Sequence, residues 1–171
     1  RLDAVVYGTL AARHGATRSA LISLLDAADS AEFFFDVNIR LSFYSDSVIR
    51  AGLERSTILK MNDDEVPVVA AAIGCSERDI IRALFSFPRL GRILITRGKD
   101  GSYCYTRDGR SIHAGTGDVK AIDTVGAGDS LSAAFLYFLS AGCGEEEALR
   151  KASLLADYVV TRPGAIPEYD E

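Results

Sequence analysis

The feature that most constrains this sequence is a glycine-containing turn at residues 123–130, which read Asp-Thr-Val-Gly-Ala-Gly-Asp-Ser. Apolar residues recur at helical spacing over residues 131–139 and Gly142 is a natural stop, so a helix is expected after the turn. Residues 119–122, Val-Lys-Ala-Ile, are expected to form a strand before it. The turn would then enter a helix N-terminus, where free N–H groups and the helix dipole favour negative charge.

Two glycines and an aspartate in this turn allow two interpretations. Gly126 and Gly128 carry no side chain, so a bulky anion can approach the backbone there. Asp129 is itself an anion at such a site, which is explained if it accepts a proton from an attacking hydroxyl while the N–H groups hold a phosphoryl group. The alternative is a tight turn with Asp129 in the first helical turn, and these residues alone favour that alternative.

Strand-like and helix-like segments alternate along the chain, which predicts one α/β domain built on a parallel sheet. The expected strands cover residues 4–7, 32–38, 56–59 and 92–96, and a hairpin is expected from residues 102–106 and 111–114. The expected helices are one capped by Thr17 with a buried stripe of Leu21, Leu24, Leu25 and Ala28, and others over residues 45–52, 62–73, 76–85 and 145–160.

The composition argues against several classes of function. The 171 residues carry a formal charge of −5 and no basic run, which argues against nucleic-acid binding. No apolar segment reaches membrane-spanning length. Three scattered cysteines and two isolated histidines show no metal-ligand spacing, and such sparse cysteines are typical of a reducing cytoplasm. We therefore expect a cytoplasmic protein that binds neither nucleic acid nor membrane.

The whole stretch at residues 123–130, with the apolar helix behind it, resembles the second signature of the PfkB/ribokinase-like carbohydrate kinases, and of their fructokinase-like members in particular. The resemblance covers essentially all of residues 1–171 but only the C-terminal part of the family's pattern. It implies a ribokinase-like three-layer α/β domain with a mostly parallel central sheet, here a fragment that lacks the N-terminal part and the lid. The full-length form is expected to be a homodimer.

The resemblance implies an ATP-dependent phosphotransferase that moves the γ-phosphate to a hydroxyl of a sugar or sugar acid. Asp129 would be the catalytic base, and the N–H groups of Gly126, Ala127 and Gly128 would receive the developing charge. The expected cofactors are ATP, Mg²⁺ and K⁺. The fragment alone is expected to be inactive.

Asp36, Asn38 and Arg40 resemble the family's Asp-x-Asn-x-Arg segment, whose polar side chains face the substrate and the phosphates. They follow a predicted buried strand, and ligands of open parallel sheets bind beyond the carboxyl ends of the strands. The alternative is a strand–loop junction in which Asp36 and Asn38 make local turn bonds.

Asn62 and Glu65 match the family's Asn-x-x-Glu motif, which helps to hold magnesium and phosphates through water. The same spacing is also a serviceable helix cap. Pro67 argues mildly against a purely structural cap, because it would be the fifth helical residue and would remove an intrahelical bond.

Thr96, Gly98 and Gly101 resemble the family's Thr-x-Gly-x-x-Gly turn over the nucleotide phosphates. A hairpin turn explains both glycines equally well without ATP.

The loop at residues 159–165 resembles the family's loop after its last helix. Members of that family bind a monovalent cation with this loop. The resemblance implies that Asp123 and the carbonyls of Val125 and Gly164 would bind such a cation here. Ser153 would lie near the adenine. Asp157, one helical turn further, departs from the small or amide residues expected there, which leaves the contact to the base open.

Two other functions remain open alongside the sugar kinase. One is a nucleoside or hydroxymethyl-pyrimidine kinase on the same fold, and the other is a nucleotide-binding domain that is inactive as a fragment. A dinucleotide-binding Rossmann domain is disfavoured, because the turn lies near the end of the chain and lacks the third glycine and the spaced acidic residue.

Overall fold

The computed structural model describes residues 2–28, 30–41 and 43–168. The chain divides into two compact units. The first comprises Arg1–Ile95 and Tyr105–Arg110, and the second comprises Thr96–Cys104 and Ser111–Glu171.

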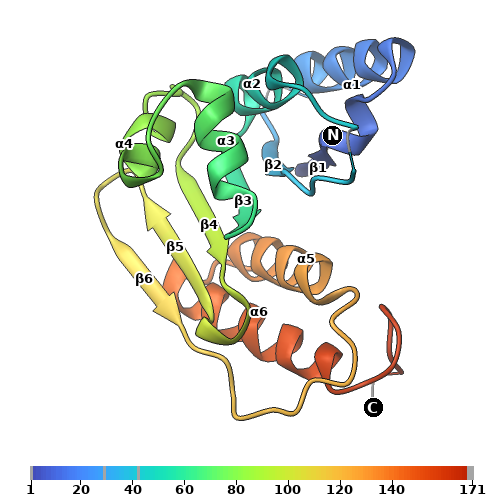
Figure 1. Cartoon of the computed structure of the whole chain (residues 1–171), viewed down its shortest axis with the longest axis vertical. Helices are drawn as coiled ribbons and strands as arrows, with labels where there is room; N and C mark the ends of the chain where they lie inside the picture. The colour runs from blue at the N-terminus through green and yellow to red at the C-terminus, as the bar shows by residue number, and fades with distance from the viewer. Residues whose placement is uncertain (1, 29, 42, 169–171) are drawn as a thin grey trace. The chain divides into compact units, whose positions relative to one another are not determined.

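Six strands form one sheet and follow one another across it in chain order (Figure 1). They are β1 (Ala4–Gly8), β2 (Glu32–Asp36), β3 (Ile58–Asn62), β4 (Arg92–Thr96), β5 (Ser102–Thr106) and β6 (Ser111–Ala114). β1 pairs with β2 and β2 with β3 in parallel, so that Val5 lies opposite Phe33 and Phe34 opposite Ile58. The predicted α/β fold with a mostly parallel sheet is confirmed.

The core of the first unit is built around β2, whose side chains are buried on both faces. Phe33, Phe34 and Phe35 are at most 1% exposed, as expected of a parallel strand covered on both sides. Each such side chain contributes about 1.5–3 kcal/mol when it leaves water. The helical elements of this unit are η1 (Thr9–Ala12), α1 (Gly15–Ala27), α2 (Asp46–Arg55), α3 (Val66–Ile73), η2 (Glu77–Asp79) and α4 (Ile80–Leu84).

Helix caps explain where several of these elements begin. Ser45 caps α2 by accepting a hydrogen bond from the Val48 N–H, as its position predicted. The predicted cap at Thr17 is wrong, because α1 begins at Gly15 and the Thr17 hydroxyl instead donates to the His14 carbonyl.

Two further expectations for these helices are corrected. Leu24, predicted to join the buried stripe of α1, is 44% exposed. The single helix expected over residues 76–85 is divided into η2 and α4, and Ser76 caps the first of them.

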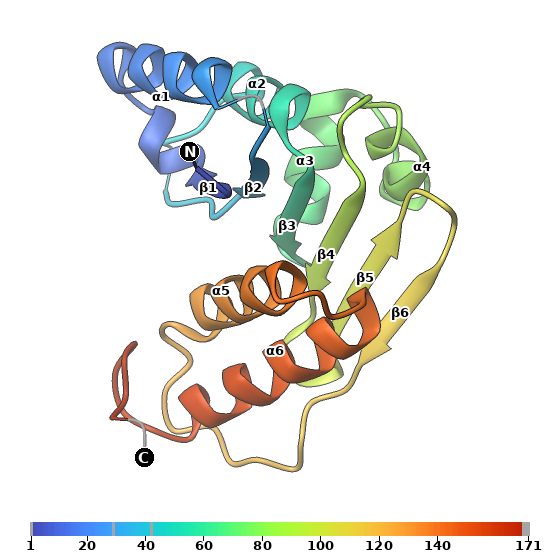
Figure 2. The ribbon, with the colours of Figure 1, turned by 180° about the vertical axis from the view of Figure 1, so that it is seen from behind.

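The second unit pairs two helices that lie side by side in both views, α5 (Ala127–Ser140) and α6 (Glu145–Val160) (Figures 1 and 2). A short turn, η3 (Gly98–Asp100), precedes β5. Leu131, Ala134 and Phe135 are the buried positions of the stripe predicted for α5.

The strand predicted at residues 119–122 is wrong. These residues form a loop in which Val119 and Ile122 are 39% and 67% exposed. The N–H groups of Ile122 and Asp123 both donate to the carbonyl of Val160 at the end of α6. Because one carbonyl at a helix end offers no ladder of partners, the segment cannot continue as a strand.

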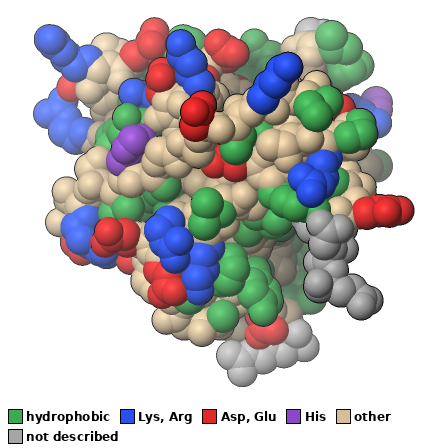
Figure 3. Space-filling view, turned by 90° about the horizontal axis from the view of Figure 1, so that it is seen from below, with side chains coloured by type: hydrophobic (Ala, Val, Ile, Leu, Met, Phe, Trp, Pro, Cys, Tyr) green, Lys and Arg blue, Asp and Glu red, His purple; other side chains and the backbone are tan. Residues whose placement is uncertain are grey.

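No helix in the described ranges is both long and apolar enough to cross a membrane. On the face drawn in Figure 3, acidic and basic side chains are interspersed and hydrophobic side chains lie in small groups among them.

The contact between Gly52 and Phe35 makes a testable prediction. A Cβ at Gly52 would lie 2.6–2.9 Å from three ring atoms of Phe35, and that ring is buried and stacked on Tyr7, which leaves it little room to move. Gly52→Ala should therefore lower the free energy of unfolding by about 1–3 kcal/mol in urea titrations. Gly15→Ala is the matched control, because nothing lies within 4 Å of a Cβ at that helical position. Equal stability of the two variants would contradict this packing.

Candidate active site

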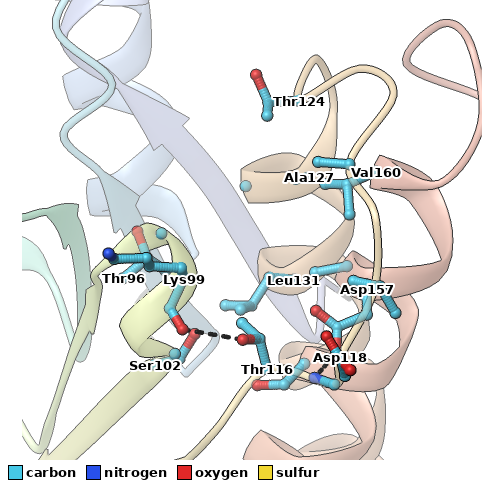
Figure 4. Close-up of a pocket in the computed structure, with 18 residues that line it drawn as sticks. Thr96, Lys99, Ser102, Thr116, Asp118, Thr124, Ala127, Leu131, Asp157 and Val160 are labelled. Atoms are coloured by element: carbon cyan, nitrogen blue, oxygen red, sulfur yellow. Dashed lines mark hydrogen bonds between the residues drawn. The ribbon is translucent and has the colours of Figure 1, made fainter.

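A pocket of about 490 Å³ lies wholly within the second unit (Figure 4). Its lining comes from the β4–β5 turn, the loop before α5, the first turns of α5 and one face of α6. Six of the residues expected to bind nucleotide or phosphate line it: Thr96, Gly98, Gly101, Ala127, Gly128 and Ser153.

The start of α5 forms one wall of this pocket and carries unused hydrogen-bond donors. The Ser130 N–H makes the first regular helical bond, to the Gly126 carbonyl at 2.8 Å. The Ala127 N–H makes only a long bond of 3.4 Å to the carbonyl of Thr124. In the described part of the chain, the N–H groups of Gly128 and Asp129 have no acceptor. Asp129 is exposed to solvent, so its carboxylate is open to a ligand, and it lies outside the set of residues that line the pocket.

The backbone at Gly126 admits only glycine. Its φ of +83° is a conformation that side chains rarely adopt. A Cβ there would also lie 2.5 Å from the carbonyl oxygen of Ala165 and 2.7 Å from its Cα. The loop after α6 therefore packs directly on the turn before α5.

Asp123 ties the same two loops together. Its Oδ1 accepts the N–H of Val125 and its Oδ2 accepts the N–H of Gly164, each at 3.0 Å. These two bonds hold the pKa of Asp123 below the usual 3.8, because they favour the ionised carboxylate. The carbonyls of Val125 and Gly164 accept no hydrogen bond from the described residues. The three residues expected to bind a monovalent cation thus lie together in this unit.

The β4–β5 turn contributes two glycines with different roles. Gly101 has a φ of +83°, and a Cβ there would lie 2.3 Å from the Ala114 carbonyl oxygen, so the fold itself requires glycine. Gly98 has no atom within 4 Å of its Cβ position. The turn is joined to the loop before α5 by the Thr116 hydroxyl, which donates to the Lys99 carbonyl at 2.9 Å (Figure 4).

The face of α6 that lines the pocket carries two buried polar side chains. Ser153 is 4% exposed, and its Oγ has no hydrogen-bond partner among the described residues. Asp157 is 8% exposed, and its Oδ2 accepts the N–H of Gly117 at 2.7 Å. Sequence reasoning identified Asp157 as unusual but did not foresee this bond.

The remaining predicted site residues belong to the first unit. Asp36 forms a buried ion pair with Lys60, whose Nζ lies 3.0 Å from Oδ2, and both side chains are less than a tenth exposed. Asn38 has a φ of +40°, which is uncommon for a residue with a side chain. Arg40 is exposed. The pairing of Asp36 with Lys60 was not predicted, since the two residues are distant in the sequence.

Asn62 and Glu65 form a reciprocal cap. The Asn62 Oδ1 accepts the Glu65 N–H and the Glu65 Oε2 accepts the Asn62 N–H, both at 2.9 Å. The Glu65 Oε1 accepts the N–H of Ile39 at 2.7 Å. Pro67 does not disfavour such a cap, contrary to the expectation from the sequence, because α3 begins at Val66 and Pro67 is its second residue, where a missing N–H costs little.

The second unit therefore combines a partly open pocket, free main-chain donors at the start of α5 and an exposed carboxylate. Main-chain donors at a helix N-terminus bind phosphate groups. The neighbouring pocket also has apolar walls from Leu131, Ala156 and Val160, which suit the flat face of a nucleobase.

Comparison with known proteins agrees with this chemistry. A family model described as pfkB family carbohydrate kinase matches residues 4–171. A 5-dehydro-2-deoxygluconokinase of Bacillus velezensis is 36% identical over 109 residues, which are 64% of this chain and 33% of that protein. One from Lacticaseibacillus casei is 27% identical over 176 residues, which cover 98% of this chain and 54% of that protein. The chain spans between about a third and just over half of these curated relatives.

Solved structures show the same fold. A fructokinase from Vibrio cholerae O395, with fructose, ADP and calcium bound, matches with a TM-score of 0.83 and 20% identity over 95% of this chain and 56% of that one. An aminoimidazole riboside kinase from Salmonella enterica, complexed with aminoimidazole riboside and an ATP analogue, has a TM-score of 0.80 at 23% identity, over 95% of this chain and 57% of its own.

The bonds of Asp123 predict how the two loops respond to acid. Because its folded-state pKa is lowered, the ionised, bonded form persists above the usual 3.8 and is lost only as pH falls through the lower folded value. In amide NMR spectra, the Val125 and Gly164 signals should titrate together with a midpoint below 3.8, and neither should titrate in Asp123→Asn. A midpoint at or above 3.8, or independent titration of the two signals, would contradict the tie.

Proposed function

The chain belongs to the pfkB family of carbohydrate kinases, and from that premise we propose that it provides the nucleotide-binding and phosphoryl-transfer part of an ATP-dependent kinase acting on a sugar or sugar acid. The observation that carries the proposal is the pair of unused N–H groups at Gly128 and Asp129, beside the exposed carboxylate of Asp129. Phosphoryl transfer needs this combination, because the reaction is catalysed mainly by positioning and by stabilising charge.

In the proposed reaction, Asp129 accepts the proton of the acceptor hydroxyl as its oxygen attacks the γ-phosphate of ATP. The N–H groups of Gly126, Ala127 and Gly128 receive the negative charge that develops on the transferred group. The exposure of Asp129 supports this role, since a general base must reach the hydroxyl it deprotonates.

ATP would occupy the pocket of the second unit, with its base against α6 near Ser153 and its phosphates near Thr96, Gly98 and Gly101. We assign magnesium to Asn62 and Glu65 through water. Their oxygens already accept backbone N–H groups, but each oxygen keeps a second lone pair for a water. A bound Mg²⁺ would neutralise charge on the phosphates.

The donor set near Asp123 suits K⁺. The unbonded carbonyls of Val125 and Gly164, together with the Asp123 carboxylate, are the oxygen ligands that such an ion takes. Its contribution would be to fix the loop before α5 rather than to take part in the transfer.

The acceptor would be recognised by Asp36, Asn38 and Arg40. Arg40 is exposed and can pair with a carboxylate of a sugar acid, whereas Asp36 is held by Lys60 and would present a neutralised pair. The relatives named 5-dehydro-2-deoxygluconokinase make 5-dehydro-2-deoxygluconate the first acceptor to test.

Asp129→Asn should lower kcat of the full-length protein by about 10²–10⁴-fold, because the variant keeps the shape of the side chain but cannot accept the proton. The Kd for ATP measured by calorimetry should change little. Glu146→Gln is the matched control, since Glu146 is an exposed carboxylate on the first turn of α6 and does not line the pocket. A kcat near the unmodified value in Asp129→Asn would refute the assignment.

A panel of acceptors separates the sugar kinase from a nucleoside kinase. Coupled ADP release should be fastest with a sugar acid or a ketose, and slower with ribose or inosine. Arg40→Ala should raise KM for the sugar acid more than for fructose, because only the acid has a carboxylate to pair with the guanidinium. Preference for a nucleoside throughout the panel would replace the proposed acceptor.

A further inference from the structure

Two polar side chains on α6 have hydrogen-bonding capacity that the protein itself does not use. Ser153 and Asp157 are four residues apart, so they share one face of the helix, and both line the pocket. The buried Oγ of Ser153 has no partner in the described structure. Buried hydroxyls are nearly always bonded, and an unbonded one costs about 1–3 kcal/mol. A ligand in the pocket is the natural partner.

Asp157 divides its carboxylate between the fold and the pocket. Oδ2 is fixed by the N–H of Gly117 at 2.7 Å, whereas Oδ1 has no partner among the described residues. An ionised carboxylate can only accept hydrogen bonds. The pocket therefore contains one oriented, acceptor-only oxygen, and the bond to Gly117 prevents both oxygens from turning to a ligand together.

The base that suits these two groups can be chosen on chemical grounds. Adenine offers an exocyclic amino group as a donor next to ring nitrogens that accept, which matches an acceptor oxygen and a hydroxyl. Hypoxanthine places a carbonyl where adenine has its amino group, and that carbonyl would face the carboxylate without a proton between them. Guanine would engage a carboxylate best through two adjacent N–H donors, but one oxygen of Asp157 is already occupied.

We infer that Asp157 determines which purine the pocket accepts: its Oδ1 accepts from the 6-amino group of adenine and repels a 6-carbonyl, while the Ser153 hydroxyl bonds a ring nitrogen of either base. This inference rests on the proposed function, because it assigns the base selectivity of the same nucleotide site. Selectivity arises here as much from the rejected carbonyl as from the accepted amine.

The Asp157→Asn substitution separates the two tasks of the side chain. Its amide oxygen can keep the bond from Gly117, which leaves the NH₂ group directed to the pocket in place of Oδ1. The acceptor becomes a donor with almost no change in shape. The preference for a 6-amino purine over a 6-oxo purine should therefore disappear or reverse.

The test is competitive binding of ATP, ITP and purine riboside triphosphate to the chain, measured by displacement of a fluorescent ADP analogue. The unmodified chain should bind ATP about 10–100-fold more tightly than ITP, with the analogue that lacks a 6-substituent between them. Asp157→Asn should bring ATP and ITP within about twofold or favour ITP. Ser153→Ala should weaken both equally, and Glu146→Gln should leave all three unchanged.

Each outcome distinguishes this inference from the proposed function. Binding of ATP and ITP with equal affinity by the unmodified chain overturns the role of Asp157 and leaves the kinase proposal standing. The same follows if folded Asp157→Asn keeps the original preference. Failure of every purine nucleotide to bind overturns both. If Asp157→Asn does not fold, as judged by circular dichroism, the three nucleotides on the unmodified chain still decide the question.

Discussion

The candidate site depends on how two loops are held against the start of α5. The carboxylate of Asp123 bonds the N–H groups of Val125 and Gly164, and the backbone of Ala165 approaches Gly126 too closely for any side chain. Asp123 accepts the Val125 N–H and Thr124 accepts a long bond from the Ala127 N–H, whereas the N–H groups of Gly128 and Asp129 have no acceptor among the described residues. A looser turn would let the chain fold back and bond them internally.

The opposite wall of the pocket also combines polar groups that hold the fold with polar groups that are left unbonded. The carboxylate of Asp157 fixes the loop before α5 through Gly117 and leaves its second oxygen to the cavity, while Ser153 leaves its hydroxyl unbonded. In contrast, Asp36 and Glu65 in the first unit are largely satisfied by protein partners. The unsatisfied polar groups of the second unit thus lie where a ligand is proposed to bind. Hydrogen bonds to that ligand would offset the free energy that these groups cost when they are unbonded.

Much of this arrangement was predictable from local signals. Alternation and turn residues gave the bounds of β4, β5, β6 and α6 as the structure has them. The turn at residues 123–130 identified the start of α5, because glycine, aspartate and helical periodicity all act within a few residues. The strand expected at residues 119–122 failed for a tertiary reason, since the N–H groups of Ile122 and Asp123 at its end are taken by the carbonyl of Val160, whose position no local pattern encodes.

The interactions that could not be predicted join residues far apart in the chain. Gly117 and Asp157 are 40 residues apart, and Asp123 and Gly164 are 41 residues apart. The error at Thr17 is of a different kind. Thr17 is a residue type that often caps helices, but α1 begins at Gly15, so Thr17 lies inside its first turn. Helix propensity therefore suggests where a helix can begin, and tertiary packing decides where it does begin.

The central claim is that the main-chain donors at the start of α5 bind the terminal phosphates of ATP. Backbone amide chemical shifts of the chain, recorded with saturating AMP and then with saturating ATP, test it most directly. The account predicts that the Gly126, Ala127, Gly128 and Asp129 amides shift with ATP and stay near their free positions with AMP, which shares the base and ribose but lacks those phosphates. Equal responses to both nucleotides, or no response to ATP, would contradict it.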